Sequence, residues 1–247
     1  MKKNIKKKRE SIKLDKPIEK PKIARVLHLT RIRKTIAERL SYSHRTIPSA
    51  TLMLEVNMEK LLKFREKVGK KIGRKVSFTA LLAKAVAKAL RNNLILNSSV
   101  EDGEVNVYED INISIAVDTP KGLLAPAVFN VDKKSVSKVS DEIKKLIEDA
   151  KSGNLTLAEL VGGTFTITNL GAFGVGTFIP LVNPPQTAII GVGKTCMKPV
   201  VVGDKIVVKP LITLSLVFDH RVVDGAPAAL FLKGVKHFLE NPHLLEK

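Results

Sequence analysis

Apolar side chains along this chain follow two spacings, one typical of β-strands and one typical of helices. Every second residue is apolar over 50–56 and 111–117, the period of two expected for a half-buried strand. Apolar residues recur every three or four positions over 78–90 and 136–150, the period of an amphipathic helix. Because helical and strand patterns alternate irregularly, the sequence predicts an α/β or α+β domain built on a mixed β-sheet.

Capping and turn residues predict where several elements begin and end. A basic opening helix is expected over 32–40, Asn57 and Ser77 are expected to cap the next two helices, and Gly153 is expected to end the fourth. The remaining expected elements are a turn over 118–122, strands over 164–168, 187–191 and 211–218, a hairpin turning at residues 203–204, and a last helix over 227–239.

Length and composition indicate one folded domain behind a basic leader. The chain has 247 residues, of which 44% are hydrophobic and 27% charged, enough to bury a single core. Residues 1–22 hold ten Lys or Arg against three acids and are interrupted by proline, a composition typical of a flexible linker. We therefore expect a flexible basic leader over 1–22 and one folded domain over 23–247.

Several classes of protein are disfavoured by composition. The net charge of +18 would suit nucleic acid, but the chain lacks zinc-finger, RNA-recognition and helix-turn-helix signatures, so nucleic-acid binding is not expected. No apolar run reaches the roughly 20 residues of a spanning helix, and the start of the chain lacks the features of a signal peptide, so no membrane association is expected. The single cysteine, Cys196, excludes a disulfide framework or cysteine-rich metal site and favours a reducing, cytoplasmic compartment without a bound metal.

The sharpest chemical signal follows the apolar strand expected over 211–218. The next seven residues read DHRVVDG, so His220 stands at a strand end between Asp219 and Asp224. Reactive groups are commonly exposed at such ends, whereas a lone histidine is more often structural. On these residues alone, a catalytic base and a structural histidine both remain open.

This segment resembles the catalytic signature of the dihydrolipoamide acyltransferases, the core subunits of 2-oxo acid dehydrogenase complexes. The resemblance spans about residues 26–247 and continues, in order, through the opening helix, 116–123 (AVDTPKGL), 162–171 (GGTFTITNLG) and 182–186 (VNPPQ). It implies the fold of chloramphenicol acetyltransferase, a two-layer α+β sandwich whose mixed sheet is flanked by helices, assembled as trimers. The domain over 23–247 is then the acyltransferase catalytic domain.

The resemblance implies three catalytic residues. His220 matches the general base that takes the proton of an attacking thiol, whose pKa near 8.5 leaves it mostly protonated at neutral pH. Asp224 matches the acid behind this base. Thr168 matches the hydroxyl that donates to the oxyanion of the tetrahedral intermediate. Without the resemblance, Thr168 would be interpreted as a strand threonine chosen for β propensity.

Supporting residues also come from the resemblance. Asn169 and Gly225 belong to the matched motifs, and an arginine of the opening helix is expected to pair with Asp224. Arg33 is favoured over Arg31, because the family usually has a small residue at the position of Arg31. The alternative for either arginine is a solvated side chain on a basic helix.

The function implied by the resemblance is transfer of an acyl group between dihydrolipoamide and coenzyme A. Residues 225–228 (GAPA) resemble acetyl- or branched-chain-type members, because they lack the charged residues usual in succinyl-type members, and of these two groups acetyl is favoured. Coenzyme A is then a substrate whose contacts are not predicted, and the lipoyl group is supplied in trans or by a domain absent from this chain. The implied partners are a homotrimer, a larger cage, lipoyl domains, and the decarboxylase and dihydrolipoamide dehydrogenase components.

Other functions remain as alternatives or are disfavoured by the sequence. A catalytically silent assembly scaffold with the same fold and a chloramphenicol-type O-acetyltransferase are the two rivals. The run GVGKT over 191–195 is similar to the end of a phosphate-binding loop, but Ala188 replaces a required glycine and Pro199 stops the helix. Cys196 has no His or acid near it in the sequence, so a covalent acyl-cysteine is disfavoured.

Overall fold

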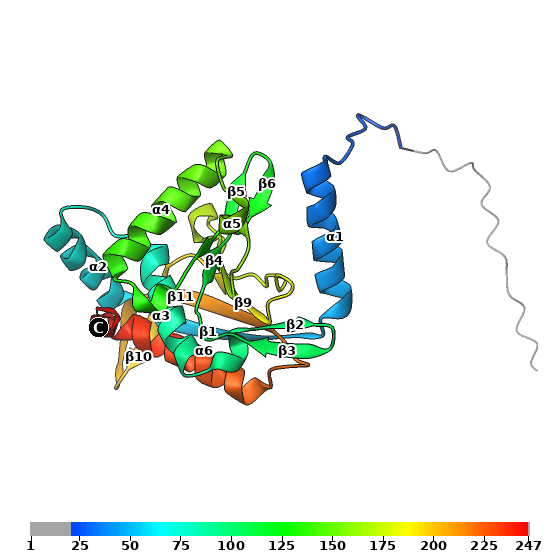
Figure 1. Cartoon of the computed structure of the whole chain (residues 1–247). Coiled ribbons are helices and arrows are strands. Elements are labelled where there is room, and N and C mark those ends of the chain that lie inside the picture. The colour runs from blue at the N-terminus through cyan, green and yellow to red at the C-terminus, as the bar shows by residue number, and fades with distance from the viewer. Residues whose placement is uncertain (1–20, 247) are drawn as a thin grey trace, which may run out of the picture.

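A mixed β-sheet and the helices packed against it form the body of the chain (Figure 1). The structure, a computed structural model, describes residues 21–246. The sheet has seven strands in the order β1-β11-β9-β8-β4-β7, with β10 paired to the first half of β11. Strands β4, β8 and β9 run parallel to one another and the other pairs are antiparallel, which confirms the predicted mixed sheet.

The elements have the following bounds. The helices are α1 (Arg31–Thr46), α2 (Glu59–Ile72), α3 (Phe78–Arg91), α4 (Val136–Ser152), α5 (Leu157–Leu160) and α6 (Gly225–Glu240), with 3₁₀ turns η1 (Leu94–Leu96), η2 (Val131–Lys133), η3 (Gly171–Phe173) and η4 (Pro242–Leu245). The strands are β1 (Ser49–Asn57), β2 (Ser98–Glu101), β3 (Glu104–Val107), β4 (Ile113–Ile115), β5 (Val117–Thr119), β6 (Gly122–Leu124), β7 (Ala127–Val128), β8 (Phe165–Asn169), β9 (Ala188–Val192), β10 (Cys196–Val202) and β11 (Lys205–Asp219).

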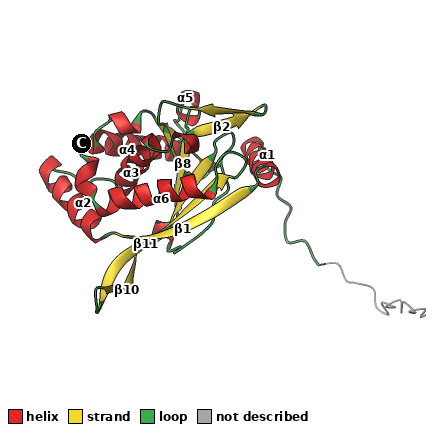
Figure 2. Ribbon diagram, turned by 90° about the horizontal axis from the view of Figure 1, so that it is seen from below, coloured by secondary structure: helices red, strands yellow, loops and turns green. Residues whose placement is uncertain are grey.

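Helices α2, α3, α4 and α6 form one layer against the sheet, whereas α1 stands apart at the opposite side (Figure 2). The layers meet in a single large core, in which Phe165 of β8 packs against Phe231 of α6 with ring centroids 5.5 Å apart. Burying such aromatic side chains contributes much of the apolar free energy that holds a sheet to its helices. The predicted two-layer arrangement is therefore observed.

Two of the three predicted capping residues are observed at the helix ends. Ser77 occupies the N-cap position of α3. The N-cap of α2 is Met58 rather than the predicted Asn57, which is the last residue of β1, although the Asn57 side chain accepts a hydrogen bond from the backbone N–H of Glu59. Gly153 ends α4 with a φ of 80°, a left-handed conformation that glycine adopts without a Cβ clash. The predicted hairpin at residues 203–204 joins β10 to β11.

Two predicted elements differ from the observed ones. The opening helix continues past residue 40 to Thr46, because buried Ser43 anchors its last turns by donating a hydrogen bond to the carbonyl of Val182. The strand expected over 111–117 is divided into β4 and β5. Pairing with β8 ends at Ala116, whose N–H donates to the carbonyl of Ile167, and β5 then pairs with β6 instead.

Lys84 of the helical layer is buried, contrary to the prediction from the sequence. The amphipathic pattern of α3 puts this residue on the polar side, yet it is only 2% exposed. Its ammonium group donates hydrogen bonds to three carbonyls at and just after η2, those of Val131, Asp132 and Lys134, at 3.3, 3.0 and 2.6 Å. Burial lowers the pKa of Lys84 below its usual value. The lysine therefore serves as an internal donor that ties η2 to α3.

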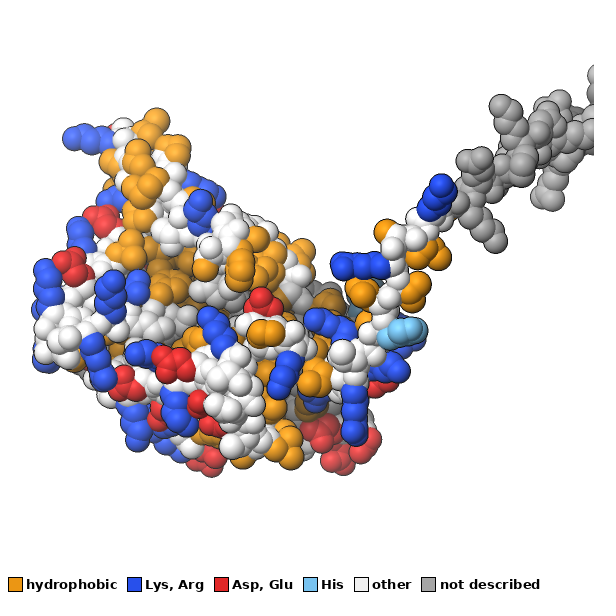
Figure 3. All heavy atoms as spheres, turned by 90° about the horizontal axis from the view of Figure 1, so that it is seen from above, with side chains coloured by type: hydrophobic (Ala, Val, Ile, Leu, Met, Phe, Trp, Pro, Cys, Tyr) orange, Lys and Arg blue, Asp and Glu red, His pale blue; other side chains and the backbone are white. Residues whose placement is uncertain are grey.

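The hairpin of β10 and the first half of β11 projects from the body (Figure 2). Its exposed apolar side chains form a patch that is visible on the projecting part of the surface in Figure 3. The members of this hairpin patch are Met197, Val201, Val202, Ile206 and Val208. Apolar patches of this kind are typical of surfaces that contact another protein.

Candidate active site

His220 lies in a tight turn between the end of β11 and the start of α6. Its backbone N–H donates to the carbonyl of Pro48 at 3.0 Å, which ties the turn to the junction between α1 and β1. The N–H of Val222 donates to the carbonyl of Asp219 at 3.1 Å and closes the turn. The His220 side chain is 49% exposed and packs against Phe218, with ring centroids 5.7 Å apart. The predicted base is therefore accessible to a substrate on a well-anchored backbone.

The structure brings His220 and Asp224 together, as the sequence predicts. Nδ1 of His220 lies 3.9 Å from Oδ1 of Asp224, within range of electrostatic attraction but too far for a hydrogen bond. Asp224 occupies the N-cap position of α6 without capping it, and its side chain is 87% exposed. Since Asp224 lies near Nδ1, Nε2 is the imidazole nitrogen that remains for acid–base chemistry.

Asp219 and Arg221 form a partly buried ion pair that sequence reasoning missed. Asp219 is 1% exposed, and the guanidinium of Arg221 reaches it through Nη2 at 2.6 Å. Hydrogen bonding to Asp219 raises the pKa of Arg221 above its usual value. The available signal was an acid two residues before an arginine at a strand end, a spacing that a tight turn brings into contact.

Thr168 and Asn169 end β8. Thr168 is half-buried and pairs with Gly191 of β9. The Asn169 side chain accepts a hydrogen bond from the N–H of Gly171 at 2.8 Å, a local turn that directs the chain away from the sheet. Asn169 therefore shapes the end of the strand next to Thr168.

Within one chain, Thr168 and His220 are far apart. Register places Thr168 opposite Gly191, and Gly191 opposite Ser215, so Ser215 is level with Thr168 two strands away. His220 follows Ser215 by five residues. At about 3.3 Å per residue and about 4.8 Å per strand, the two catalytic candidates are separated by roughly 19 Å. A hydroxyl at that distance cannot contact a substrate held by the imidazole.

The supporting residues are also not gathered around Asp224. Arg33 lies against the β5–β6 hairpin. If Gly122 of this hairpin carried a Cβ atom, that atom would lie 3.3 Å from Nη2 of Arg33. Among residues 21–246, neither Arg31 nor Arg33 forms an ion pair with Asp224. A Cβ placed on Gly225 would meet nothing within 4 Å, so the folded chain alone does not require glycine there.

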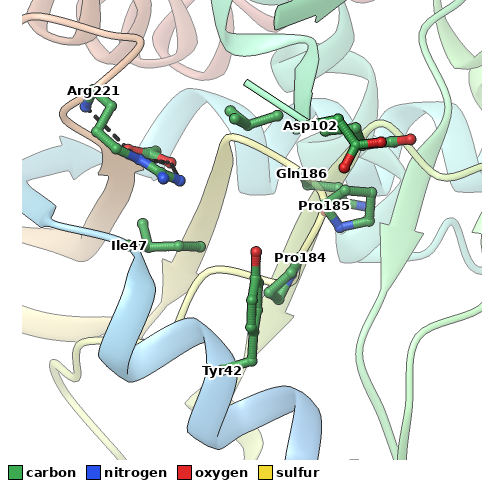
Figure 4. Close-up of a pocket in the computed structure, with 10 residues that line it drawn as sticks. Tyr42, Ile47, Asp102, Pro184, Pro185, Gln186 and Arg221 are labelled. Carbon is green, nitrogen blue, oxygen red and sulfur yellow. Dashed lines mark hydrogen bonds and ion pairs between the residues drawn. The ribbon is translucent and has the colours of Figure 1, made fainter. Parts of the chain in front are cut away.

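A cavity of about 300 Å³ lies beside the His220 turn. Tyr42 at the C-terminal end of α1, Asp102 of the β2–β3 turn, Pro185 and Arg221 line it from four parts of the sequence (Figure 4). Asp219 also contributes to its wall. The residues on either side of His220, rather than His220 itself, therefore face this cavity.

The competing signals in the sequence lack the structural context that their functions need. The GVGKT run leads from β9 into the strand β10, so there is no helix N-terminus to hold a phosphate. Residues 21–246 contain no group of three or more His, Cys, Asp or Glu side chains arranged to hold a metal ion. In the same part of the chain, no helix is long and apolar enough to cross a membrane.

Comparison with solved structures defines the fold class. The chain matches chloramphenicol acetyltransferase with a TM-score of 0.52 and 14% identity, over 86% of this chain and 99% of that chain. At this identity the likeness concerns the fold alone, a mixed sheet with flanking helices, and it confirms the predicted class.

The chain belongs to the family of 2-oxoacid dehydrogenase acyltransferase catalytic domains, whose family model matches residues 21–246. Among solved structures it is similar to the dihydrolipoamide acetyltransferase of Azotobacter vinelandii, with 35% identity and a TM-score of 0.86, over 93% of this chain and 99% of that chain. The resemblance found in the sequence motifs is thereby confirmed.

Curated relatives carry two acyl specificities at the same level of identity. The chain is 40% identical to the acetyltransferase component of the Rickettsia bellii pyruvate dehydrogenase complex, over 87% of this chain and 52% of the relative. It is also 40% identical to the succinyltransferase component of the Buchnera aphidicola 2-oxoglutarate dehydrogenase complex, over 86% of this chain and 53% of the relative. The chain thus spans about half the length of the curated relatives it matches.

Proposed function

We propose that this chain transfers an acyl group between a dihydrolipoyl thiol and the thiol of coenzyme A, as the catalytic core of a 2-oxo acid dehydrogenase complex. The observation that carries the proposal is the exposed His220 on its anchored turn, with Asp224 facing one imidazole nitrogen. Family membership supports the reaction class.

Residue spacing supports the assignment of the three catalytic residues. Crystallographic and enzymatic work on the A. vinelandii enzyme addressed a serine, a histidine and an asparagine in its mechanism; the histidine follows the serine by 52 positions and precedes the asparagine by four. Thr168, His220 and Asp224 have the same spacing in this chain. Threonine retains the hydroxyl of serine, and aspartate adds a negative charge in place of the amide.

The reaction follows from these groups. Nε2 of His220 takes the proton of the coenzyme A thiol as its sulfur attacks the thioester carbonyl carbon. The carbonyl oxygen becomes an oxyanion, to which the Thr168 hydroxyl donates a hydrogen bond. When the tetrahedral intermediate collapses, the carbon–sulfur bond to the dihydrolipoyl group breaks, and its thiolate takes the proton back from His220. Asp224 favours the imidazolium form by its negative charge. The reverse reaction uses the same steps.

A second copy of the chain completes each site in this proposal. The separation of roughly 19 Å between His220 and Thr168 in one chain leaves the base without its oxyanion donor. A trimer in which His220 of one copy faces Thr168 of the next resolves this separation. The exposed hairpin patch supports such assembly. A similar solved structure, 35% identical with a TM-score of 0.85, is the cubic core of a pyruvate dehydrogenase complex, which supports a larger cage.

The remaining parts of the proposal concern substrate and partners. An acetyltransferase and a succinyltransferase are equally similar to this chain, so overall identity does not select the acyl group. We keep acetyl as the proposed acyl group, because the GAPA sequence after Asp224 lacks the charged residues of succinyl-type members. Lipoyl groups come from another polypeptide or another part of the protein, and the decarboxylase and dihydrolipoamide dehydrogenase components supply and reoxidise them. A dithiol substrate must stay reduced, which fits a cytoplasmic location.

An acceptor assay tests the proposed function. The purified chain is given coenzyme A and acetyl, isobutyryl or succinyl dihydrolipoamide at matched concentrations, and acyl-coenzyme A is quantified. The expected result is transfer, fastest with acetyl, and a loss of about 10²- to 10⁴-fold in kcat for His220→Ala. His237→Ala, a change at an exposed histidine of α6, is the matched control. Absence of transfer from all three donors would favour a silent scaffold instead.

A further inference from the structure

The buried carboxylate of Asp219 is fully occupied by its neighbour Arg221. Oδ1 of Asp219 accepts hydrogen bonds from the backbone N–H and from Nε of Arg221, both at 3.0 Å. Oδ2 accepts from Nε at 3.1 Å and from Nη2 at 2.6 Å. Figure 4 shows Arg221 at the edge of the cavity with these interactions drawn as dashed lines. The two residues that flank His220 are thus joined by four contacts.

This pair cannot easily be broken. A carboxylate that is 1% exposed loses its hydration, and removing its cationic partner leaves an uncompensated buried charge. Two-point contact between a guanidinium and a carboxylate is also geometrically specific, so it fixes orientation as well as distance. The Asp219–Arg221 pair is therefore a rigid part of the turn.

The pair encloses the backbone of His220. The bond from the N–H of Arg221 to the Asp219 side chain spans His220, as in an Asx turn. The N–H of His220 is held by the carbonyl of Pro48, and the carbonyl of Asp219 accepts from Val222. The peptide groups before and after His220 are therefore both held by hydrogen bonds, and only the side-chain torsions of His220 remain free.

Within one chain, Asp224 cannot by itself fix the orientation of the His220 imidazole. Its carboxylate is highly exposed and lies 3.9 Å from Nδ1, beyond hydrogen-bond distance. The orientation of the His220 imidazole therefore depends on the backbone of the turn that carries it.

We propose that Asp219 and Arg221 are positioning residues for the catalytic base: their ion pair holds the turn so that the imidazole of His220 meets the substrate thiol. The inference rests on the acyl transfer proposed above. Misplacing a reacting group by about 1 Å can cost roughly a hundredfold in rate. The pair should therefore affect kcat while contributing little to substrate binding.

Variants of Arg221 test the proposal. Arg221→Ala is expected to lower kcat by about tenfold to a hundredfold, with KM changed by less than about twofold. Arg221→Lys, which keeps the charge but not the two-point contact, should retain more activity than Arg221→Ala. Arg74→Ala removes an arginine–aspartate pair with Asp141 on the exposed surface, and this control should retain full kcat.

Two further measurements separate positioning from structure or substrate binding. In the His220→Ala background, Arg221→Ala should lower kcat no further, because the base that it positions is already absent. Guanidinium chloride far below denaturing concentrations should restore part of the kcat of Arg221→Ala, by pairing with Asp219, whereas equimolar sodium chloride should not. An additional loss in the His220→Ala background, or an effect on KM alone, would overturn the inference.

Folding and function are controlled separately. If thermal melting shows that Arg221→Ala does not fold, Arg221→Lys is compared in the same way, both with His220 intact and in the His220→Ala background. An active wild-type chain with unaffected Arg221 variants would overturn this inference alone. A wild-type chain without acyl transfer would overturn the proposed function instead.

Discussion

Mixing two severely weakened variants tests whether each active site is shared between neighbouring copies. We expect His220→Ala to lower kcat by about 10²- to 10⁴-fold and Thr168→Ala by about 10²- to 10³-fold. Because strand register separates the two residues by roughly 19 Å within a chain, an active pair must come from two chains. When the variants are refolded together in equal amounts, some sites should combine an intact His220 with an intact Thr168.

The size of the recovery follows from random assembly. In a closed ring, each site takes its base from one copy and its hydroxyl from the next, and each contributor is intact half of the time. About a quarter of the sites are then wild type. Activity should approach about a quarter of the wild-type value per site, which exceeds the mean of the two variants by more than about tenfold.

The assay is acetyl transfer to coenzyme A, with subunit exchange confirmed by native mass spectrometry on one isotopically labelled variant. Mixing two separate preparations of His220→Ala is the control and should give no gain. If exchange is complete and activity stays at the mean of the two variants, both residues act within one chain and the shared site is wrong.

Three other predictions concern the rest of the chain. Lys84→Ala removes the side-chain donor of three carbonyls, of which, among residues 21–246, only that of Val131 keeps a backbone donor, the N–H of Lys134. This change should lower the free energy of unfolding by about 2–4 kcal/mol in urea titrations, while the exposed Lys67→Ala should have little effect. Hydrogen bonds from Lys209, the larger effect, and from Lys63 lower the pKa of Glu59 from 4.5 to about 2. The contribution of ionised Glu59 to folding stability is therefore fully present above pH 4.5 and is lost as the pH falls towards 2. Glu59→Gln should flatten this part of the stability curve, and a wild-type-like acid slope would contradict the assignment. Deleting residues 1–22 should leave acyl transfer nearly unchanged, whereas dissociation of the oligomer, seen by size-exclusion chromatography, would contradict a linker role.

Features that depend on neighbouring residues in the sequence were predictable. The N-cap at Ser77 and the end of α4 at Gly153 arise from conformational preferences of single residues, and the turn at 203–204 arises from a short polar pair. The proximity of His220 and Asp224 was implied by the family resemblance. Its structural basis is also local, because a turn followed by a helix start places residues four apart near each other.

Features that depend on distant segments were not predictable. The burial of Lys84 requires the carbonyls of η2, almost 50 residues away, and the interruption between β4 and β5 reflects which strand each one pairs with. Helical spacing alone cannot show that a polar position will meet a turn from another element. The arginine partner expected for Asp224 is a similar case, since Arg33 packs against the β5–β6 hairpin within its own chain.

The catalytic candidates and their proposed positioning residues divide into two groups with different origins. Asp219, His220, Arg221 and Asp224 lie within six residues, and one chain builds their turn from its own hydrogen bonds. Thr168 lies two strands away and nearer the opposite end of the sheet, so local spacing could not connect it to the base, and only the family resemblance did. In the proposed mechanism, a single copy therefore holds the base without an oxyanion donor. Conditions that separate the copies without unfolding them should abolish transfer while the turn around His220 stays intact.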